Sequence, residues 1–260
     1  MDVPAPGWRF PPDRLILSCD EVHVWRTTPG RPTVCVESLE QTLTADERKR
    51  AEQFRFSKDR MHFIVTRGLL RAILGRYLAT DPRTLQFCYS PYGKPGLTGD
   101  DGNNGLFFNV THSHGMALFA VTRNREVGVD LEYIDAHVAC EQIAERFFSP
   151  YEVGMLRGVP QQMRSGAFFC CWARKEAYLK ARGVGLSFGL SQFDVSVTPG
   201  TPAALLNTRE ENQDISCWSL YDLSPGSGYV AALAAKGHPE RLQCWQWSEE
   251  EPSKFTARRL

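Results

Sequence analysis

Several features that define large classes of protein are missing from this sequence of 260 residues. It has no net charge, because 30 Lys and Arg residues balance 30 Asp and Glu residues. Proteins that bind nucleic acid through bulk charge usually carry a basic excess, so we expect no nucleic-acid partner. Apolar runs are short, as in Met116–Val121, whereas a membrane-spanning helix needs about 20 apolar residues. The N-terminus lacks a signal-peptide pattern, so we expect neither a membrane segment nor secretion.

Cysteines are present but never in a CxxC spacing. This absence argues against a zinc ribbon, a thioredoxin-type redox pair and a small disulfide framework. The adjacent Cys170 and Cys171 fall inside a helical pattern and are interpreted as small apolar filler. We therefore predict a cytoplasmic protein with reduced thiols. The eight cysteines are residues 19, 35, 88, 140, 170, 171, 217 and 244.

The remaining composition indicates a globular protein with both helices and strands. Hydrophobic residues make up 42% of the chain and charged residues 23%, which suits one or two domains with substantial cores. Thr44 and Glu47 have the spacing of a capping box and predict the start of a helix. An apolar strand at 229–235 echoes one at 116–122, which indicates two similar halves that divide near 123–126. Helices are predicted at 44–54, 58–78, 141–147, from 149 onward and at 165–181, and strands at 22–25, 84–90, 107–111, 116–122, 127–133, 189–197, 215–221 and 229–235.

The strand at 127–133 carries the most informative pattern. Its side chains alternate between two faces, so Gly128, Asp130 and Glu132 share one face and the apolar residues share the other. Two carboxylates that lie about 7 Å apart can share one hard cation. Gly128 would leave room for a ligand near the backbone. The alternative is an ordinary half-exposed strand whose acids face water.

The helix at 165–181 carries a second group of polar residues. Trp172, Glu176 and Lys180 recur every four residues and therefore share one helix face. A surface Glu–Lys pair on such a face would stabilise the helix by only about 0.2–0.5 kcal/mol. Because the rest of this helix is strongly apolar, a buried charge there would instead need a partner or a metal ion.

Three other groups are candidates for contacts with phosphate, each with an ordinary alternative. His112 and His114 alone are too few ligands for zinc, but His112 beside the hydroxyl of Thr111 suits a phosphate or ribose contact. Lys94 lies on a tight loop, where a lysine is usually just solvated. The basic residues near the first predicted helices form either a solvated face or an anion-binding site; they are Arg50, Arg55, Lys58 and Arg60.

Five motifs occur in an order that resembles one enzyme family. They are YGKP at Tyr92–Pro95, FNVTHS at Phe108–Ser113, GVDLE at Gly128–Glu132, FFSPYE at Phe147–Glu152 and the segment Trp172–Leu186. This order is similar to that of the 4′-phosphopantetheinyl transferases, specifically the larger type that includes a surfactin-synthetase-activating enzyme. The resemblance covers about residues 50–190. It implies an α+β fold with two similar α/β halves in a pseudo-twofold arrangement, at 1–124 and 125–260, in a monomer with its site between them.

The resemblance also implies an activity and a set of site residues. Enzymes of this family, which include holo-acyl-carrier-protein synthases, move the 4′-phosphopantetheine arm of coenzyme A to a serine of an apo acyl or peptidyl carrier protein and release 3′,5′-ADP. Asp130, Glu132 and Glu176 would hold Mg²⁺, with Mn²⁺ as a substitute. Glu176 and Lys180 would be catalytic, with Glu176 accepting the serine proton either directly or through a metal-bound water.

Coenzyme A would contact a further set of residues. The family often has a basic residue beside Lys94, whereas Ser90 and Tyr92 are neutral here, so the 3′-phosphate would depend more on Arg50. Tyr89 to Gly93 would line the adenine side. The full expected set is Arg50, Tyr89, Ser90, Tyr92, Gly93, Lys94, Asn109, Thr111, His112 and Lys180.

Two other functions remain open from the sequence. A Mg²⁺-dependent nucleotide pyrophosphohydrolase could use the same acids with water as the nucleophile. A non-catalytic module that binds coenzyme A or a carrier protein is the third reading, although such a module has no need for three acids. The sequence does not distinguish fatty-acid, polyketide and nonribosomal-peptide carriers.

Overall fold

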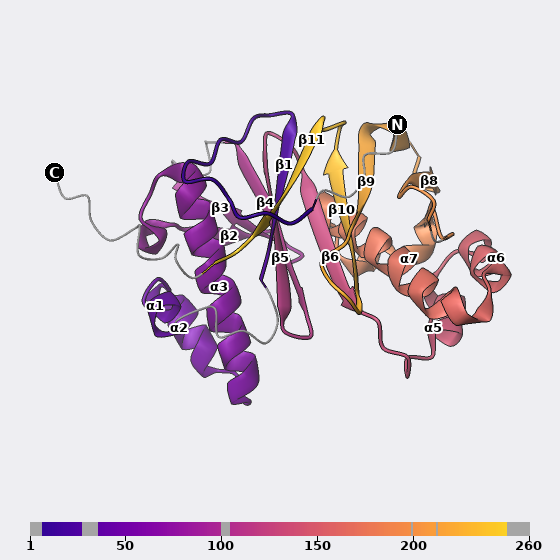
Figure 1. Cartoon of the computed structure of the whole chain (residues 1–260), viewed down its shortest axis with the longest axis horizontal. Helices are drawn as coiled ribbons and strands as arrows, with labels where there is room; N and C mark the ends of the chain where they lie inside the picture. Colours follow the sequence, from indigo (N-terminus) through magenta and orange to yellow (C-terminus); the bar gives the residue numbers. More distant parts are fainter. Residues whose placement is uncertain (1–6, 28–35, 100–104, 199, 212, 249–260) are drawn as a thin grey trace.

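The computed structural model describes residues 7–27, 36–99, 105–198, 200–211 and 213–248. Two β-sheets occupy the centre of the molecule, and one group of helices packs on each outer side (Figure 1). This mixture of helices and strands confirms the expected α+β class.

The first sheet has the strand order β11-β1-β5-β4, and helices α1 to α3 lie beside it (Figure 1). Along α3, Leu69, Ile73 and Leu74 form a fully buried stripe that belongs to the same hydrophobic cluster as Trp25 and Phe119 of the sheet. A stripe at helical spacing is what attaches a helix to a sheet. The elements are β1 (Glu21–Arg26), α1 (Val36–Glu40), α2 (Ala45–Glu52), α3 (Ser57–Leu78), β2 (Phe87–Tyr89), β3 (Pro95–Leu97), β4 (Leu106–Ser113) and β5 (Met116–Arg123).

The second sheet has the order β6-β10-β9, and α7 packs across β6 and β10. Small buried residues, Ala173 and Ala177 on α7 and Ala232 and Ala234 on β10, allow a close approach of helix and sheet. The elements of this half are β6 (Val127–Tyr133), α5 (Cys140–Phe147), α6 (Pro150–Gly158), α7 (Gln161–Arg182), β7 (Phe193–Val195), β8 (Leu205–Thr208), β9 (Trp218–Leu223) and β10 (Tyr229–Lys236).

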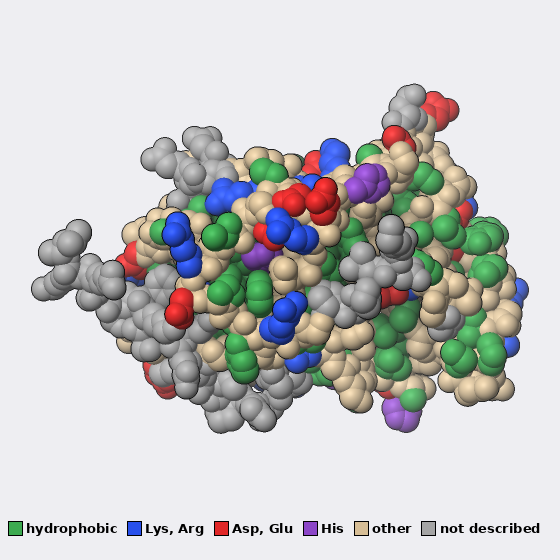
Figure 2. All heavy atoms as spheres, turned by 45° about the horizontal axis from the view of Figure 1, so that its top comes forward, with side chains coloured by type: hydrophobic (Ala, Val, Ile, Leu, Met, Phe, Trp, Pro, Cys, Tyr) green, Lys and Arg blue, Asp and Glu red, His purple; other side chains and the backbone are tan. Residues whose placement is uncertain are grey.

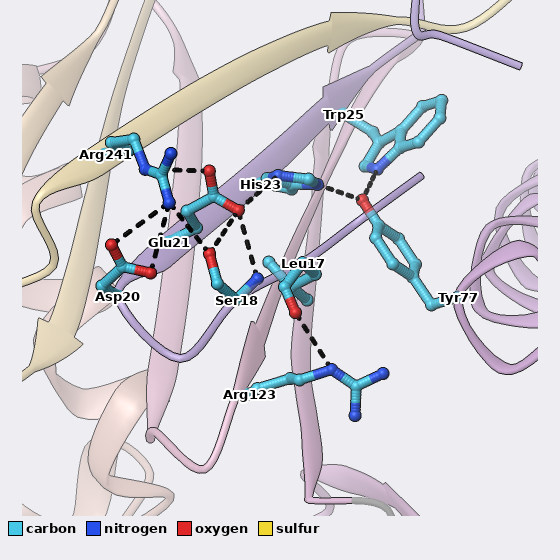
Figure 3. Close-up of polar contacts among 9 residues, drawn as sticks. All are labelled: Leu17, Ser18, Asp20, Glu21, His23, Trp25, Tyr77, Arg123 and Arg241. Carbon is cyan, nitrogen blue, oxygen red and sulfur yellow. Dashed lines mark hydrogen bonds and ion pairs between the residues drawn. The ribbon is translucent and has the colours of Figure 1, made fainter. Parts of the chain in front are cut away.

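The last strand, β11 (Arg241–Gln246), returns to the first sheet and runs parallel to β1. Its Arg241 guanidinium lies 3.2 Å from an Asp20 oxygen and 3.0 Å from a Glu21 oxygen (Figure 3). These contacts fasten the strand to the beginning of β1. A division of the chain at 124 and 125 therefore leaves one strand of the later segment in the sheet of the earlier one.

Most predicted element boundaries agree with the structure. Both capping boxes form: Thr44 with Glu47 begins α2, and Ser149 with Glu152 begins α6. The long helix ends before Gly183 as expected, but it begins at 161 rather than 165. The pattern missed the short α1, β3 and β8 as well as β11.

Three predicted strands are shorter than expected. In the segment 84–90, the first residue belongs to the 3₁₀ turn Pro82–Thr84, and the strand is confined to Phe87–Tyr89. In 189–197, Gly189 has a φ of 82° and a 3₁₀ turn follows it, so the strand is confined to Phe193–Val195. The segment 215–221 likewise begins with a 3₁₀ turn before β9. Local turn chemistry at Pro and Gly overrides strand propensity in the first two cases.

A buried histidine lies between β1 and α3 (Figure 3). His23 is 2% exposed, and its Nδ1 lies 2.8 Å from the Tyr77 hydroxyl oxygen. That oxygen accepts a hydrogen bond from Trp25 Nε1 at 2.9 Å, so the hydroxyl proton is available for Nδ1. The arrangement therefore suits a neutral imidazole with Nδ1 as the acceptor.

We predict that His23 makes stability depend on acid pH. Burial lowers the pKa of His23 from 6.5 to about 4; Glu21 opposes this shift and Arg241 adds to it. Because the unfolded chain binds this proton more readily, stability from the neutral ring is complete above pH 6.5 and is lost as the pH falls toward 4. The loss should reach roughly 3 kcal/mol.

Urea unfolding between pH 7 and 4, at about one-unit steps, measures this effect. His23→Gln keeps an acceptor for Tyr77 but cannot bind a proton. Between pH 7 and 4 its free energy of unfolding should therefore fall by roughly 3 kcal/mol less than that of the wild type. Equal pH slopes in the two proteins would contradict the assignment.

Charge on the visible surface is mixed. On the face shown in Figure 2, basic and acidic side chains lie interspersed among hydrophobic ones, which agrees with the formal net charge of zero. In the described ranges, every helix is too short or too polar to cross a membrane. The seven cysteines in these ranges are free thiols, and Cys35 lies outside them.

Candidate active site

β6 and α7 bring the predicted acidic residues into one region. On β6, Val129 and Leu131 are buried in the hydrophobic cluster shared with β1 and β5. Asp130, on the opposite face of the strand, contacts α7 through Lys180. The alternation predicted from the sequence therefore holds, but this face of the strand lies against a helix rather than in open water.

Asp130 is the centre of a compact polar group. It is 3% exposed, and its Oδ1 accepts hydrogen bonds from Lys180 Nζ at 2.5 Å and from Thr111 Oγ1 at 3.3 Å. Lys180 Nζ also donates to Thr111 Oγ1 at 3.2 Å. Because Thr111 belongs to β4 and Lys180 to α7, this group joins the two halves of the chain.

Glu132 and Glu176 share the electrostatic environment of Asp130. Burial raises the pKa of Glu132 to about 7; the negative charges of Asp130 and Glu176 add to this shift, and Lys180 opposes it. Burial also raises the pKa of Glu176, with Asp130 adding and Lys180 opposing. Carboxylates that disfavour one another's charged form in this way are relieved by a cation.

The donor chemistry fits a hard cation, although no ready-made site is present. Asp130 Oδ2 and Glu176 Oε1 are buried and have no hydrogen-bond partner in the structure. Carboxylate oxygens are the protein ligands that Mg²⁺ prefers. In the part of the chain that the structure describes, however, no three His, Cys, Asp or Glu side chains converge as a ligand set. Lys180 binds Oδ1 of Asp130, so Oδ2 is the oxygen that a cation would use.

Gly128 does not leave room for a ligand, contrary to the expectation from the sequence. A Cβ at this position would lie 2.1 Å from the Ala177 carbonyl oxygen and 2.2 Å from the Ala181 nitrogen of α7. The missing side chain instead allows the helix backbone to lie directly on β6. This close approach sets how near Glu176 and Lys180 come to Asp130.

We predict that Gly128→Ala destabilises the protein by roughly 1–3 kcal/mol, because backbone atoms must move to admit the methyl group. Urea unfolding measures the change. Gly154→Ala is the matched control, since Gly154 lies within α6 and its Cβ would meet nothing within 4 Å. The control should be neutral or more stable by up to about 1 kcal/mol. Equal stability of the two variants would contradict the prediction.

A pocket of about 210 Å³ lies beside α7. The predicted catalytic residues Glu176 and Lys180 line it together with Lys94 and Asn109 from the first half. The predicted site residues are therefore gathered from sequence positions far apart. The full lining is Tyr92, Gly93, Lys94, Pro95, Asn109, Val110, Glu176, Leu179, Lys180, Gly183 and Gly185.

The loop that carries Lys94 is held by its own hydrogen bonds. The Ser90 amide donates to the Lys94 carbonyl at 2.9 Å, and Ser90 Oγ accepts from the Lys94 amide at 3.1 Å. Gly93 has a φ of 81°, which permits the turn, and its amide donates to the Ser90 carbonyl. Tyr92 is 60% exposed beside Gly185. The Ser90 hydroxyl is thus engaged within the loop.

Lys94 and Asn109 both bind backbone groups of β6. Lys94 Nζ donates to the carbonyls of Val127 at 3.0 Å and Ala181 at 2.8 Å. Burial lowers the pKa of Lys94 to about 8, and Glu126 opposes that shift. Asn109 is 5% exposed, and its Oδ1 accepts from the Val129 amide at 2.9 Å. The predicted coenzyme A contacts of these two side chains stay predictions.

A second pocket, of about 270 Å³, adjoins the first, because Pro95 and Val110 line both. His112 lines it opposite residues of α3, which include His62. Partial desolvation lowers the pKa of His112, and the positive charges of His62 and Lys180 add to this effect. His112 therefore faces this second pocket, although it neighbours the polar group around Thr111.

Arg50 lies at the edge of the second pocket. It is exposed, and its guanidinium lies 5.6 Å from the centre of the Phe63 ring, which lines that pocket. Tyr89 is also exposed, at 47%, and lines neither pocket. The structure thus brings Arg50 and His112 toward one pocket and Glu176 to the other, whereas Asp130 and Glu132 line neither of the two.

Arg67, which the sequence motifs do not indicate, also lines the second pocket. Its guanidinium lies 3.6 Å from Glu47 and donates to the Tyr89 hydroxyl at 2.8 Å. Arg71, one turn later, also binds Glu47, at 2.8 Å, and is 1% exposed. Two arginines at i and i+4 on a helix rich in buried residues require an acidic partner, and that spacing could have indicated them.

Comparison with known proteins identifies the family. A model of the 4′-phosphopantetheinyl transferase superfamily matches residues 126–234, and a model of the 4′-phosphopantetheinyl transferase N-terminal region matches residues 34–124. Over 92% of its length the chain is 39% identical to 4′-phosphopantetheinyl transferase HetI of Nostoc sp., of which it covers 98%. The chain belongs to the 4′-phosphopantetheinyl transferase family.

Two Bacillus members of this family are also similar along most of their length. The chain is 30% identical to 4′-phosphopantetheinyl transferase psf-1 of Bacillus pumilus over 80% of its own residues and 88% of that protein. It is 23% identical to 4′-phosphopantetheinyl transferase Sfp of Bacillus subtilis over 80% of its residues and 89% of Sfp. The resemblance inferred from the five motifs is therefore confirmed.

Proposed function

We propose that this protein transfers the 4′-phosphopantetheine arm of coenzyme A to a serine of an apo acyl or peptidyl carrier protein and releases 3′,5′-ADP. The observation that carries the proposal is the polar group of Asp130, Lys180 and Thr111, with Glu176 beside it, at a pocket lined by both halves. Membership of the transferase family supports the reaction class. The mixed acids and lysines suit a substrate that carries a pyrophosphate.

In the proposed reaction, the serine oxygen attacks the phosphorus next to pantetheine, and the bond from that phosphorus to the 3′,5′-ADP oxygen breaks. Glu176 accepts the serine proton, and its raised pKa makes it a stronger base than an ordinary glutamate while no cation is bound to it. Lys180 contacts the pyrophosphate and stabilises the charge on the departing ADP. Asp130 and Thr111 hold Lys180 in place for this contact.

We assign Mg²⁺, or Mn²⁺ in its place, to Asp130, Glu132 and Glu176. The unpartnered oxygens of Asp130 and Glu176 support this assignment. A cation bound there would neutralise part of the pyrophosphate charge. The negative charge of Asp130 raises the pKa of both Glu132 and Glu176, and a bound cation would relieve this repulsion.

We assign coenzyme A to the two adjoining pockets. Lys94 has one N–H beyond its two carbonyl contacts. His112 lines the second pocket, and Thr111 lies between it and Val110, which lines both pockets. Arg50, beside the second pocket, would bind the 3′-phosphate. The remaining proposed contacts are Tyr89, Ser90, Tyr92, Gly93, Asn109 and Lys180.

We also propose a cytoplasmic monomer built from two similar halves, 1–124 and 125–260. The free thiols of the described cysteines support a reducing compartment. The pocket lined by residues of both halves supports a site that one chain completes alone.

The test is an incubation of the protein with coenzyme A, Mg²⁺ and a panel of apo carriers, followed by mass spectrometry of each carrier. We expect a mass gain of one phosphopantetheine on the carrier serine and release of 3′,5′-ADP. Release of 3′,5′-ADP without any carrier would instead identify a pyrophosphohydrolase. If the protein binds coenzyme A or the carrier equally well after the metal ion is chelated, and modifies no carrier, it is a binding module. Acetyl-coenzyme A in parallel reports whether acylated donors are accepted.

A further inference from the structure

The outer edge of β6 is attached to the first half by side chains rather than by another strand. Within the described sheets, β6 pairs with β10 on one side and has no strand partner on the other. On that open side, the Val127 carbonyl accepts from Lys94, and the Val129 amide donates to Asn109. The Tyr133 amide donates to Ser113 Oγ at 3.2 Å. Three side chains of the first half thus provide hydrogen bonds that a neighbouring strand would otherwise provide.

Lys94 differs from the other two because it also reaches α7. Its second acceptor, the Ala181 carbonyl, belongs to the last turn of that helix, where carbonyls lack partners within the helix and favour a cation. One ammonium therefore joins the first-half loop, the strand that carries Asp130 and the helix that carries Glu176.

The stem of Lys94 passes close to the residue that ends α7. Its Cδ lies 3.4 Å from the position that a Cβ would have on Gly183, the residue that ends α7. The loop on which it lies is closed by hydrogen bonds between Ser90 and Lys94. The side chain is thus held at both ends before any ligand enters.

We propose that Lys94 is a positioning residue, which holds β6 and α7 at the separation where the acids and Lys180 meet. In this role it acts through the backbone of those two elements, and a contact with phosphate through its third N–H is secondary. The kinetic part of the proposal rests on the proposed transferase function. The structural part does not depend on it.

Hydrogen–deuterium exchange and steady-state kinetics of Lys94→Met test the proposal. We expect amide exchange at 127–131 and 178–183 to accelerate about 10-fold, because two buried carbonyls lose their common donor. We expect kcat to fall about 10- to 100-fold, as displacement of catalytic groups by about 1 Å can do, with KM for coenzyme A changed less than about 3-fold. Lys49→Met, at an exposed lysine of α2, should leave both measurements unchanged.

A second variant separates the two roles of Lys94. Lys94→Arg keeps the positive charge that a phosphate would contact. Its planar guanidinium, however, replaces the ammonium that donates to two carbonyls at once. We therefore expect neither amide exchange nor kcat to return to the wild-type value. The proposal would be overturned if Lys94→Met raised the KM for coenzyme A but kept wild-type amide exchange, and if Lys94→Arg restored that KM. If Lys94→Met does not fold, Lys94→Gln undergoes the same exchange measurement, and wild-type protection there would also overturn it. If the wild-type protein transfers nothing, the exchange results still decide the structural part.

Discussion

Replacement of Asp130 by asparagine is expected to lower the rate of carrier modification at least about 1,000-fold. Asparagine has nearly the same shape, but it removes the negative charge that holds Lys180 and the oxygen that remains free for a cation. Both effects act on the charge that develops on the departing 3′,5′-ADP. A carboxylate that merely faced water would show no such loss.

Initial rates of carrier modification by mass spectrometry, at saturating coenzyme A and Mg²⁺, measure this effect. Asp81→Asn is the matched control, because Asp81 is an exposed carboxylate that pairs with Arg83 away from the site, and its rate should equal that of the wild type. Unfolding in urea should show Asp130→Asn within about 1 kcal/mol of the wild type, since the change also relieves repulsion among the three carboxylates. Undiminished transfer by a folded Asp130→Asn protein would remove Asp130 from the mechanism.

The sequence predicted which residues face the same way but not what they face. The period-two alternation of 127–133 correctly separated the apolar side of β6 from the side that carries Asp130. It could not indicate that α7 lies against Gly128, because that contact depends on packing between elements about 50 residues apart. The hydrogen bonds of Lys94 to two backbone carbonyls escaped prediction for the same reason.

Long-range pairing also limited the prediction of the fold. Local signals such as the capping boxes at Thr44 and Ser149 were read correctly, because a cap is determined by four consecutive residues. β11 has no such local signal, and its place beside β1 depends on residues more than 200 positions apart. The motif order indicated the family, which local physical rules alone could not do.

A buried ion pair that no sequence motif indicates supports the helix of the site. Lys175 and Glu152 are each 0% exposed, and their charged atoms lie 2.7 Å apart. Lys175 also donates to the carbonyls of Leu190 and Phe193, and Glu152 accepts from the Val195 amide. The pair therefore connects α6, α7 and the chain around β7. Since Glu176 follows Lys175 directly, this anchor fixes the helix on which the proposed base lies.

We predict that Lys175→Met destabilises the protein by about 3–5 kcal/mol, because it leaves the Glu152 carboxylate buried without its cation. The free energy of unfolding in urea measures the loss. Arg157→Met is the matched control: it breaks the pair with Glu145, whose partners are 63% and 52% exposed, and should cost less than about 1 kcal/mol. Adding Glu152→Gln to Lys175→Met removes the uncompensated charge and should recover part of the loss. If Lys175→Met and Arg157→Met cost the same, the buried pair does not anchor α7.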